Sequence, residues 1–145
     1  MNIIETIQAV LEEFPKINSL HIDYNENAPD EYGLYPTGDR LVKEDILGNQ
    51  ERSHTFILYA DFHSFNDYDR LSNSGTLLEL QQWLERYADG QSITATIGDK
   101  ELTGKLKKIT CYNGMLFSIP DNNINSAVRY QLQITADYII ESEEL

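Results

Sequence analysis

The sequence predicts an α+β fold, with a mainly antiparallel sheet of four to six strands packed by two helices. Apolar residues recur at helical spacing in one early segment and one central segment. The segments between and after them alternate between apolar and polar residues, or are rich in β-branched and aromatic residues. Because helices do not alternate regularly with strands, the order favours α+β over a doubly wound α/β fold.

The first helix is predicted at the very start of the chain. Asn2 can cap its first turn, with Glu5 three residues later in the position of a capping box. Pro15 stops the helix, because the residue before a proline is pushed out of the helical region. The stripe that faces the core consists of Ile3, Ile7, Val10, Leu11 and Phe14.

A half-buried strand is predicted next, over Asn18–Tyr24, where apolar and polar residues alternate. An acidic, proline-containing loop follows over Asn25–Glu31. Tyr32–Pro36 is predicted to be a short strand or an extended arm. The function of the whole segment 25–38 is not indicated by any motif.

Two further strands, Leu41–Leu47 and Arg52–His63, are predicted to form a hairpin through Gly48-Asn49. The second of these strands has apolar residues on both faces, from Phe56 to Ala60. A strand of this kind is typically covered on both sides, so we expect it to lie centrally in the sheet.

The second helix is predicted over Asp67–Asp89, with a left-handed cap at Asp89-Gly90 and a break or bend near Gly75. Trp83 on this helix is expected to fill the core or a groove, with an interface anchor as the alternative. The core-facing stripe consists of Leu77, Leu80, Leu84 and Tyr87.

The last third of the chain is predicted to be sheet. Ile93–Ile97 alternates and precedes a turn at Gly98-Asp99, which indicates a small side hairpin. Lys105–Ile119 is predicted to be two strands joined by an Asn113-Gly114 turn, because this dipeptide favours a type I′ turn. Val128–Ile140 is the long final strand, and the acidic tail 141–145 is expected to fray.

Composition indicates one globular domain, residues 1–145. The chain has 24 acidic and 11 basic residues and a formal net charge of −13. This excess argues against binding nucleic acid through phosphate contacts, which need clustered Lys and Arg. The one cationic cluster, Lys105, Lys107 and Lys108 with Lys100 nearby, is interpreted as a solvated strand edge.

The single cysteine, Cys111, excludes an intrachain disulfide and favours a reducing compartment. The early residues lack the basic region of a secretory signal, and no apolar run approaches the roughly 20 residues of a membrane span. An intracellular, soluble protein without membrane contacts is therefore expected.

No catalytic residue, metal ligand or cofactor is assigned. His21 with Asp23, and Asp61 with His63, each place an imidazole and a carboxylate on one strand face. If the two strands were neighbours, four metal ligands could converge, whereas solvated strand ends are the simpler interpretation. Cys111 shares a strand face with Ile109, and a buried thiol in an apolar setting is usually inert. We therefore predict that the chain is not an enzyme.

Several segments together resemble a family of small prophage structural proteins of the head–tail module of long-tailed phages, described as minor capsid or tail-terminator-like proteins. The resemblance spans nearly the whole chain and is carried by structural motifs. These are MNIIETIQAVL at the start, HTFILYADF, LLELQQWLERYADG, YNGMLFSI and AVRYQLQITADYI.

The resemblance implies a tail-terminator or head–tail joining subunit. Such subunits form a ring, expected to be hexameric, which caps the tail tube and provides the surface for head docking. The implied partners are other copies of the chain, the tail-tube protein and the head-completion protein. DNA would pass through the ring without tight binding. The implied location is the host cytoplasm during assembly and then the virion.

Two sets of residues are candidates for such a role. Tyr32, Leu34 and Tyr35 form an aromatic cluster in a polar stretch, which predicts a subunit or partner interface, with a small satellite core as the equal alternative. The acids Glu26, Asp30 and Glu31 are predicted to face or flank the channel, where their charge would repel the phosphates of passing DNA.

The alternative function is that of a small acidic intracellular binding protein, which mimics DNA or neutralises a basic partner. The net charge supports it, but the acids are scattered along the sequence. The one run, Glu141, Glu143 and Glu144, is typical of a solvated tail. A third possibility is a metal-dependent enzyme that uses the His–Asp pairs.

Overall fold

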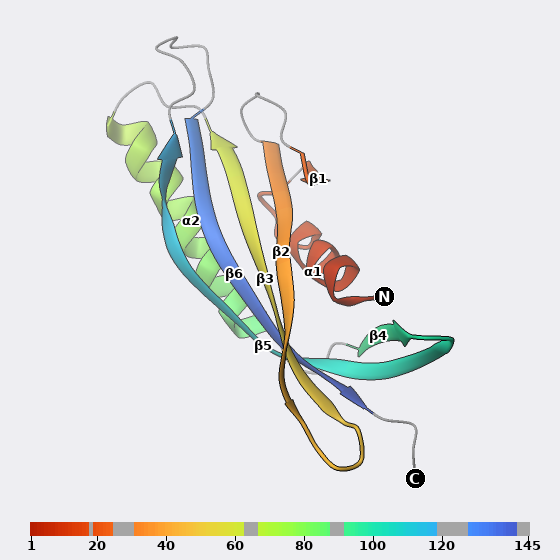
Figure 1. Cartoon of the computed structure of the whole chain (residues 1–145). Coiled ribbons are helices and arrows are strands. Elements are labelled where there is room, and N and C mark those ends of the chain that lie inside the picture. Colours follow the sequence, from red (N-terminus) through yellow and green to blue (C-terminus); the bar gives the residue numbers. More distant parts are fainter. Residues whose placement is uncertain (18, 25–30, 63–66, 88–91, 119–127, 142–145) are drawn as a thin grey trace.

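A computed structural model of the chain describes residues 1–17, 19–24, 31–62, 67–87, 92–118 and 128–141. One sheet with the strand order β1-β2-β3-β6-β5-β4 curls into a half-barrel against the two helices (Figure 1). The elements are α1 (Ile3–Glu12), β1 (Leu20–Ile22), β2 (Glu31–Glu44), β3 (Gln50–Phe62), α2 (Asp67–Tyr87), β4 (Ser92–Ile97), β5 (Lys100–Ser118) and β6 (Val128–Glu141).

The predicted α+β class and the two helices are confirmed, but the predicted simple antiparallel sheet is wrong in detail. The sheet is curled and mixed, because β1 pairs with β2 in parallel, with Leu20 opposite Tyr32. The other neighbouring strands pair antiparallel. Alternation of residues shows which side chains share a strand face, but it contains no information about the direction of the neighbouring strand.

The predicted hairpin at Asn113-Gly114 is also wrong. β5 runs without a turn from Lys100 to Ser118, and its pairing with β6 shifts register between Tyr112 and Met115. The two turn-forming residues are therefore absorbed in a β-bulge. A Cβ atom at residue 114 would lie 3.3 Å from Leu77 Cδ2, so Gly114 lets α2 pack closely on the bulge.

The two other predicted hairpins are confirmed. β2 and β3 are joined across residues 45–49, with Gly48 at a φ of 90°, and β4 and β5 are joined at Gly98, with a φ of 63°. The segment Tyr32–Pro36 is not a separate strand, because β2 already starts at Glu31. Nor does Gly75 break the second helix, which is continuous over Asp67–Tyr87.

The first helix follows its prediction closely. The Asn2 side chain accepts a hydrogen bond from the Glu5 amide at 2.9 Å, and the Glu5 carboxylate accepts one from the Asn2 amide at 3.1 Å. This capping box satisfies two amides that the first turn leaves without helical partners. The helix ends at Glu12, ahead of Pro15.

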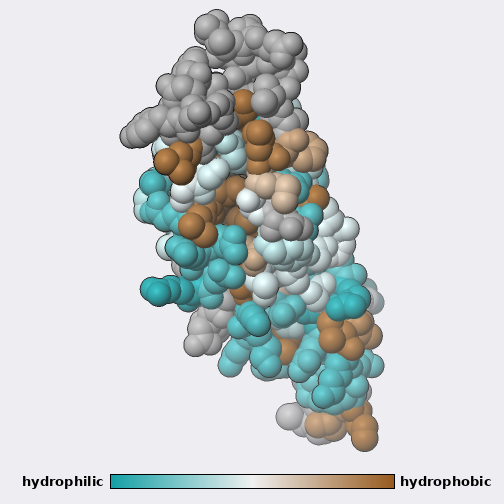
Figure 2. Space-filling model, turned by 90° about the vertical axis from the view of Figure 1, so that its left-hand side faces the viewer, coloured by the Kyte–Doolittle hydropathy of each residue, from teal (hydrophilic) through white to brown (hydrophobic). Residues whose placement is uncertain are grey.

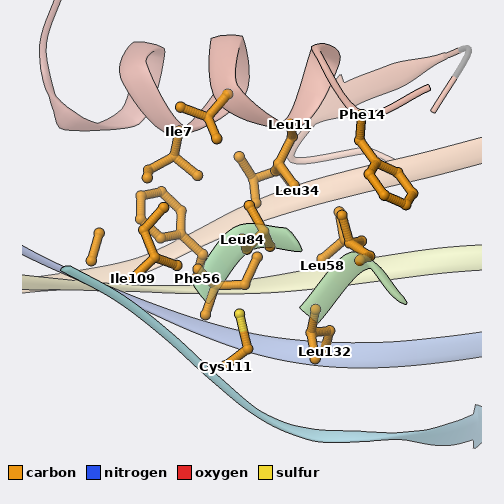
Figure 3. Packing of buried hydrophobic residues seen from close by; sticks show 14 of the residues in the cluster. Ile7, Leu11, Phe14, Leu34, Phe56, Leu58, Leu84, Ile109, Cys111 and Leu132 are labelled. Atoms are coloured by element: carbon orange, nitrogen blue, oxygen red, sulfur yellow. The ribbon is translucent and has the colours of Figure 1, made fainter. Parts of the chain in front are cut away.

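The core lies between the helices and one face of the sheet (Figure 3). Along β6, every second residue from Val128 to Ile140 is buried, which is the pattern of a strand with one face toward the core. Trp83 packs at 5.3 Å, ring centre to ring centre, from Phe14, so its predicted role as a core or groove filler is confirmed. Residues that point into the core include Ile7, Leu11, Leu34, Phe56, Leu58, Leu84, Ile109 and Leu132.

β3 lies between β2 and β6, so its predicted central position is confirmed. Its predicted cover on both faces is only half correct. Phe56 and Leu58 are buried under the helices, whereas Ile57 and Tyr59 are half-buried on the face that the helices leave open. On this open face, Tyr59 packs against Tyr35 of β2 and Phe117 of β5.

Candidate protein–protein interaction surfaces

A long hairpin arm extends beyond the helix-covered part of the sheet (Figure 1). We define the arm as residues 37–52, the last part of β2, the turn and the first part of β3. All β2 residues from Thr37 to Glu44 are exposed. The arm tip, defined by four exposed apolar side chains, consists of Leu41, Val42, Ile46 and Leu47.

The turn of the arm is held by the carboxylate of Asp45 and by two backbone hydrogen bonds, from the Asp45 amide to the Asn49 carbonyl and from the Gly48 amide to the Asp45 carbonyl. Asp45 Oδ1 accepts hydrogen bonds from the amides of Leu47 and Asn49, each at 2.9 Å, and Asp45 Oδ2 accepts one from Asn49 Nδ2 at 3.0 Å. These hydrogen bonds, led by the Asn49 side chain, lower the pKa of Asp45 from its ordinary value. The turn therefore presents Ile46 and Leu47 to solvent in a defined conformation.

The root of the arm is braced by a second carboxylate. Asp39 Oδ2 accepts a hydrogen bond from Arg52 Nε at 2.6 Å, and Asp39 Oδ1 accepts one from the Tyr138 hydroxyl at 2.5 Å. The Asp39 hydrogen bond raises the pKa of Arg52, and burial, followed by Asp39, raises the pKa of Tyr138. Because this network links β2, β3 and β6, the arm continues the sheet in a fixed direction.

A second apolar surface lies at the other end of the molecule, over α2 and the adjoining end of β5. Figure 2 shows hydrophobic side chains near this upper end and again at the lower end, with a largely hydrophilic band between them. Leu71 and Leu78 are about two helical turns apart, so they lie on one side of α2. We call the exposed apolar residues of this end the edge patch. Leu71 and Leu78 lie on α2, Leu116 lies on the helix side of β5, and Met115 and Phe117 lie on the open face of the sheet.

The backbone beside each surface is a free strand edge. Among the described residues, β4 covers only residues 100–105 of β5 and β1 covers only residues 32–34 of β2, so the remaining outer edges of β5 and β2 have no described strand beside them. The free edges of β2 and β5 carry features that oppose pairing with another strand. The β2–β3 and β5–β6 pairs contain bulges, and β2 also contains Pro36. Gln81 of α2 also donates a hydrogen bond to the Cys111 carbonyl at 3.1 Å. These edges are thus better suited to side-chain contacts than to strand addition.

The open face of the sheet carries an aromatic cluster that is tied to an ion pair. Tyr59 lies 5.2 Å from Tyr35 and 4.9 Å from Phe117, ring centre to ring centre, and the Arg129 guanidinium lies 5.5 Å above the Tyr59 ring. Arg129 Nε also donates to Asp61 Oδ1 at 2.9 Å. Asp61 holds the pKa of Arg129 above its ordinary value. The pair fixes the position of Arg129 over the cluster.

A shallow groove follows the root of the arm. Two open cavities of about 560 and 500 Å³ share Glu51 and Lys107 among their lining residues. The cationic residues that line them are Lys43 and Arg40 on β2, Arg52 on β3, and Lys107 with Lys108 on β5. The lysines of the cluster on β5 are exposed, so their predicted solvation is confirmed. The predicted edge position is wrong for Lys105, which pairs with Ser92 of β4 and Ile139 of β6.

The predicted interface residues lie in different environments. Tyr32 and Leu34 are buried in the main core, so in this structure their side chains are not available to a partner. Both side chains lie on the face of β2 that is turned toward the helices, which explains their burial. Tyr35 is half-buried and points to the open face with Tyr59, and its interface role stays a prediction.

Of the predicted channel acids, Glu26 and Asp30 lie outside the described residues. Glu31 lies at the start of β2, where its Oε2 is 3.2 Å from His21 Nε2. That contact joins β1 to β2, so Glu31 has a local structural partner whether or not it also faces a channel.

The two His–Asp pairs are not joined in the described structure. His21 lies on the edge strand β1, and Asp61 on β3 pairs with Arg129. His63 lies outside the described residues. Within the described ranges, no three His, Cys, Asp or Glu side chains form a group that could hold a metal ion.

Cys111 is buried in the core, as its position in step with Ile109 predicts. Burial is the main cause that raises the pKa of its thiol from 9.0 to about 12, with a smaller contribution from the charge of Glu85. A thiol with so high a pKa contains almost no thiolate at neutral pH, which makes it a poor nucleophile.

Both apolar surfaces were missed by sequence reasoning. Ile46 and Leu47 directly precede Gly48-Asn49, and apolar residues beside a turn were a usable signal for the arm tip. The edge patch had no such signal, since Leu71 and Leu78 belong to an ordinary helical segment and Leu116 and Phe117 to an apparent hairpin strand.

No protein-family model matches the sequence, and no curated protein is significantly similar to it. Neither α1 nor α2 is long and apolar enough to cross a membrane.

Proposed function

We propose that this chain is a structural subunit of the phage head–tail junction, a tail terminator or head–tail joining protein. In this role, copies of the chain form a ring, expected to be hexameric, that caps the tail tube and receives the head. The observation that carries the proposal is the braced arm with its exposed apolar tip.

The arm has the properties of an assembly element. Exposed apolar residues gain free energy when a partner removes them from water, at roughly 25 cal/mol per Å² of buried apolar surface. Ile46 is fully exposed, and Leu47 retains more than half of its surface in solvent. Because Asp45 and Asp39 hold the turn and the root, little conformational freedom remains to be lost when the arm binds.

The charge of the chain suits a ring through which DNA passes. With a net charge of −13 per subunit, a ring would repel phosphates wherever acidic side chains line the lumen. The sequence resemblance to head–tail module proteins supports the same assignment. The tail-tube protein and the head-completion protein are therefore the proposed external partners, and the virion is the proposed final location.

The first test is the mass of the purified chain over a concentration series, by light scattering with and without Mg²⁺. We expect a discrete closed oligomer, and electron microscopy should show rings and capped ends when tail tubes are added. The double variant Ile46→Ser/Leu47→Ser, which preserves the charge, should reduce both oligomer formation and the capping of tail tubes. The control variant Thr96→Ser, at another exposed site, should change neither.

A chain that stays monomeric at every concentration and does not cap tail tubes would contradict the proposal. Competition with DNA for a basic protein would then favour the acidic binding protein. If rings form but do not cap tail tubes, the assembly role stands and the tail-terminator assignment is contradicted.

A further inference from the structure

We infer that the groove at the root of the arm binds an acidic segment of a partner protein. The groove lies on one chain, so the inference goes beyond the proposed ring and does not depend on it. Its cavities of about 560 and 500 Å³ share Glu51 and Lys107, and a third cavity of about 460 Å³ shares Arg40 and Ser53 with the second. The three cavities are therefore continuous.

Two rows of side chains form the floor and the rims of the groove. Residues that pair across strands lie side by side on one face of a sheet. Ser53 lies six residues from Tyr59 on β3, so both point to the open face. Each row has a cation on β2, a cation on β5 and one acid on the strands between them. The lower row consists of Lys43, Glu51, Ile139 and Lys105, and the upper row of Arg40, Ser53, Asp137 and Lys108.

A β-bulge adds a fifth cation to the groove. Successive residues of a regular strand point to opposite faces, so Lys107 and Lys108 would not share one. The pairing of β5 with β6 shifts register between Leu106 and Lys108, which makes Lys107 the extra residue. Leu106 and Ile109 are both buried in the core. Lys107 and Lys108 are both exposed, and both line the cavity of about 500 Å³. Bulges redirect side chains in this way beside functional sites.

The cations of the rows are not neutralised within the described part of the chain. None of the five, Arg40, Lys43, Lys105, Lys107 and Lys108, forms an ion pair or a side-chain hydrogen bond with another described residue. All five are exposed. They are therefore available to the anionic groups of a partner.

The groove stays positive when its acids are included. Glu51 and Asp137 lie within the rows, and Glu141 and Asp45 line the lower end. The Asp45 carboxylate is already held by the amides of the turn. These four acids face five cations, in a chain whose net charge is −13.

The remaining charged residues of the arm do not alter this balance. Arg52 and Asp39 line parts of the groove, and they pair with each other. Glu44 pairs with Gln50 across the strands, which places it on the other face of the sheet, where its carboxylate accepts a hydrogen bond from the Gln50 side chain.

The chemistry of the groove favours an acidic peptide over a nucleic acid. Carboxylates two residues apart on an extended peptide are separated by about 7 Å, which is also the separation of the two rows along the strands. Glu51 and Asp137 need hydrogen-bond donors, which a peptide supplies through its backbone amides. A phosphodiester backbone has no such donor. The net charge of the chain opposes a long polyanion as well.

Fluorescence anisotropy with a fluorescein-labelled peptide of alternating glutamate and serine tests the inference. We expect saturable binding at low salt that weakens as the NaCl concentration rises, and no binding of the same peptide with glutamine in place of glutamate. Lys107→Gln/Lys108→Gln should weaken binding at least about fourfold, because each exposed ion pair contributes about two- to fivefold.

The matched control is Arg86→Gln/Lys100→Gln. This double variant removes the same charge at exposed residues outside the rows, so it should change the affinity by less than about twofold. Urea unfolding verifies that both double variants are folded, and their midpoints should match that of the parent chain because all four side chains are exposed.

The inference is overturned by any of three results. Equal losses in the two double variants would mean that only the net charge matters. No saturable binding at low salt would mean that the groove has no affinity for an acidic segment. Tighter binding of an oligothymidine with the same charge as the peptide would mean a nucleic-acid site.

Light scattering on the same samples separates this inference from the proposed ring. Peptide binding by a chain that stays monomeric supports the groove and contradicts the ring. A ring that forms from a chain without peptide binding contradicts the groove and supports the ring.

Discussion

The two halves of the β2–β3 hairpin differ in what covers them. In the upper half, Leu34 and Phe56 are buried beneath α1 and α2 (Figure 3). In the arm, the same two strands have no helix against them, and β2 is exposed from Thr37 onward. The upper half is held by burial of apolar surface, whereas the arm is held by its backbone ladder and two carboxylates.

This difference indicates what each half contributes to the stability of the chain. A hairpin without a packed face is marginal in water, so the arm depends on the sheet that it continues. Its apolar residues contribute little to the stability of the isolated chain and remain available to a partner. Substitutions in the two halves should therefore separate effects on folding from effects on the proposed assembly.

The largest difference is expected between Phe56→Ala and Ile46→Ala. Phe56 is 1% exposed, and its truncation leaves a cavity in the core that should lower the free energy of unfolding by about 3–5 kcal/mol. Ile46 is fully exposed, so its truncation should change that free energy by less than about 0.5 kcal/mol. Urea unfolding measures both, and comparable losses would show that the arm is part of the folding unit.

Gly104→Ala should have the next largest effect, because its Cβ would lie 1.8 Å from the Ile139 carbonyl oxygen. Backbone strands must move apart to accept it, at a cost of roughly 2–4 kcal/mol. Gly75→Ala is the matched control, since no atom lies within 4 Å of its Cβ and alanine favours a helix by about 0.5–1 kcal/mol. If Gly104→Ala unfolds at the same urea concentration as the parent chain, the close approach of β5 and β6 is wrong.

The two ion pairs provide a third comparison of the halves. Asp61, on the helix-backed half, is 2% exposed, and Asp61→Ala leaves Arg129 without its carboxylate at a cost of about 2–3 kcal/mol. Asp39→Ala at the root of the arm should cost about 1 kcal/mol, because Asp39 and Arg52 are partly solvated. Only Asp39→Ala should increase hydrogen exchange along the arm. An increase in exchange along the arm with Asp61→Ala and not with Asp39→Ala would refute the proposed bracing.

Cys111 on β5 should make the helix-covered core sensitive to alkaline pH. Its folded pKa, about 12, is above the ordinary value of 9.0, so the unfolded chain loses this proton first as pH rises. The contribution is therefore fully present below pH 9 and declines above it, by about 1 kcal/mol at pH 10. Urea unfolding of the parent chain and of Cys111→Ala at pH 8 and pH 10 isolates this effect. If the free energy of unfolding changes equally between the two pH values for both proteins, the prediction is contradicted.

The smallest effect is expected at the turn of the arm. The lowered pKa of Asp45 means that its hydrogen bonds are present above pH 3.8 and are lost as pH falls through the lowered value. Asp45→Ala should speed hydrogen exchange of the Leu47 and Asn49 amides at neutral pH without moving the urea midpoint. A shift of that midpoint would show that the turn supports more than the arm.

Much of the fold could be predicted because the relevant signals are local. The capping box at Asn2 and Glu5 and the apolar stripe of α1 act within a few residues of each other. The turn at Gly48-Asn49 and the small hairpin at Gly98 likewise depend on glycine conformations that the neighbouring residues do not override.

The exposure of the apolar residues on the strands could not be predicted in the same way. Leu34 and Leu41 lie on one strand and have the same chemistry, yet one is fully buried and the other is exposed. Whether a helix lies over a given stretch of a strand depends on where α1 and α2 end in space, and periodicity along the chain contains no such information.

The sequence by itself determined the α+β class, both helices, the arm hairpin and the buried, unreactive setting of Cys111, because propensity, periodicity and capping are properties of neighbouring residues. Only the tertiary structure decided that Asn113-Gly114 forms a bulge under α2 and that β1 runs parallel to β2. It also decided which apolar residues are left exposed at the arm tip and the edge patch. These outcomes depend on contacts between distant segments, whose packing overrides local preference.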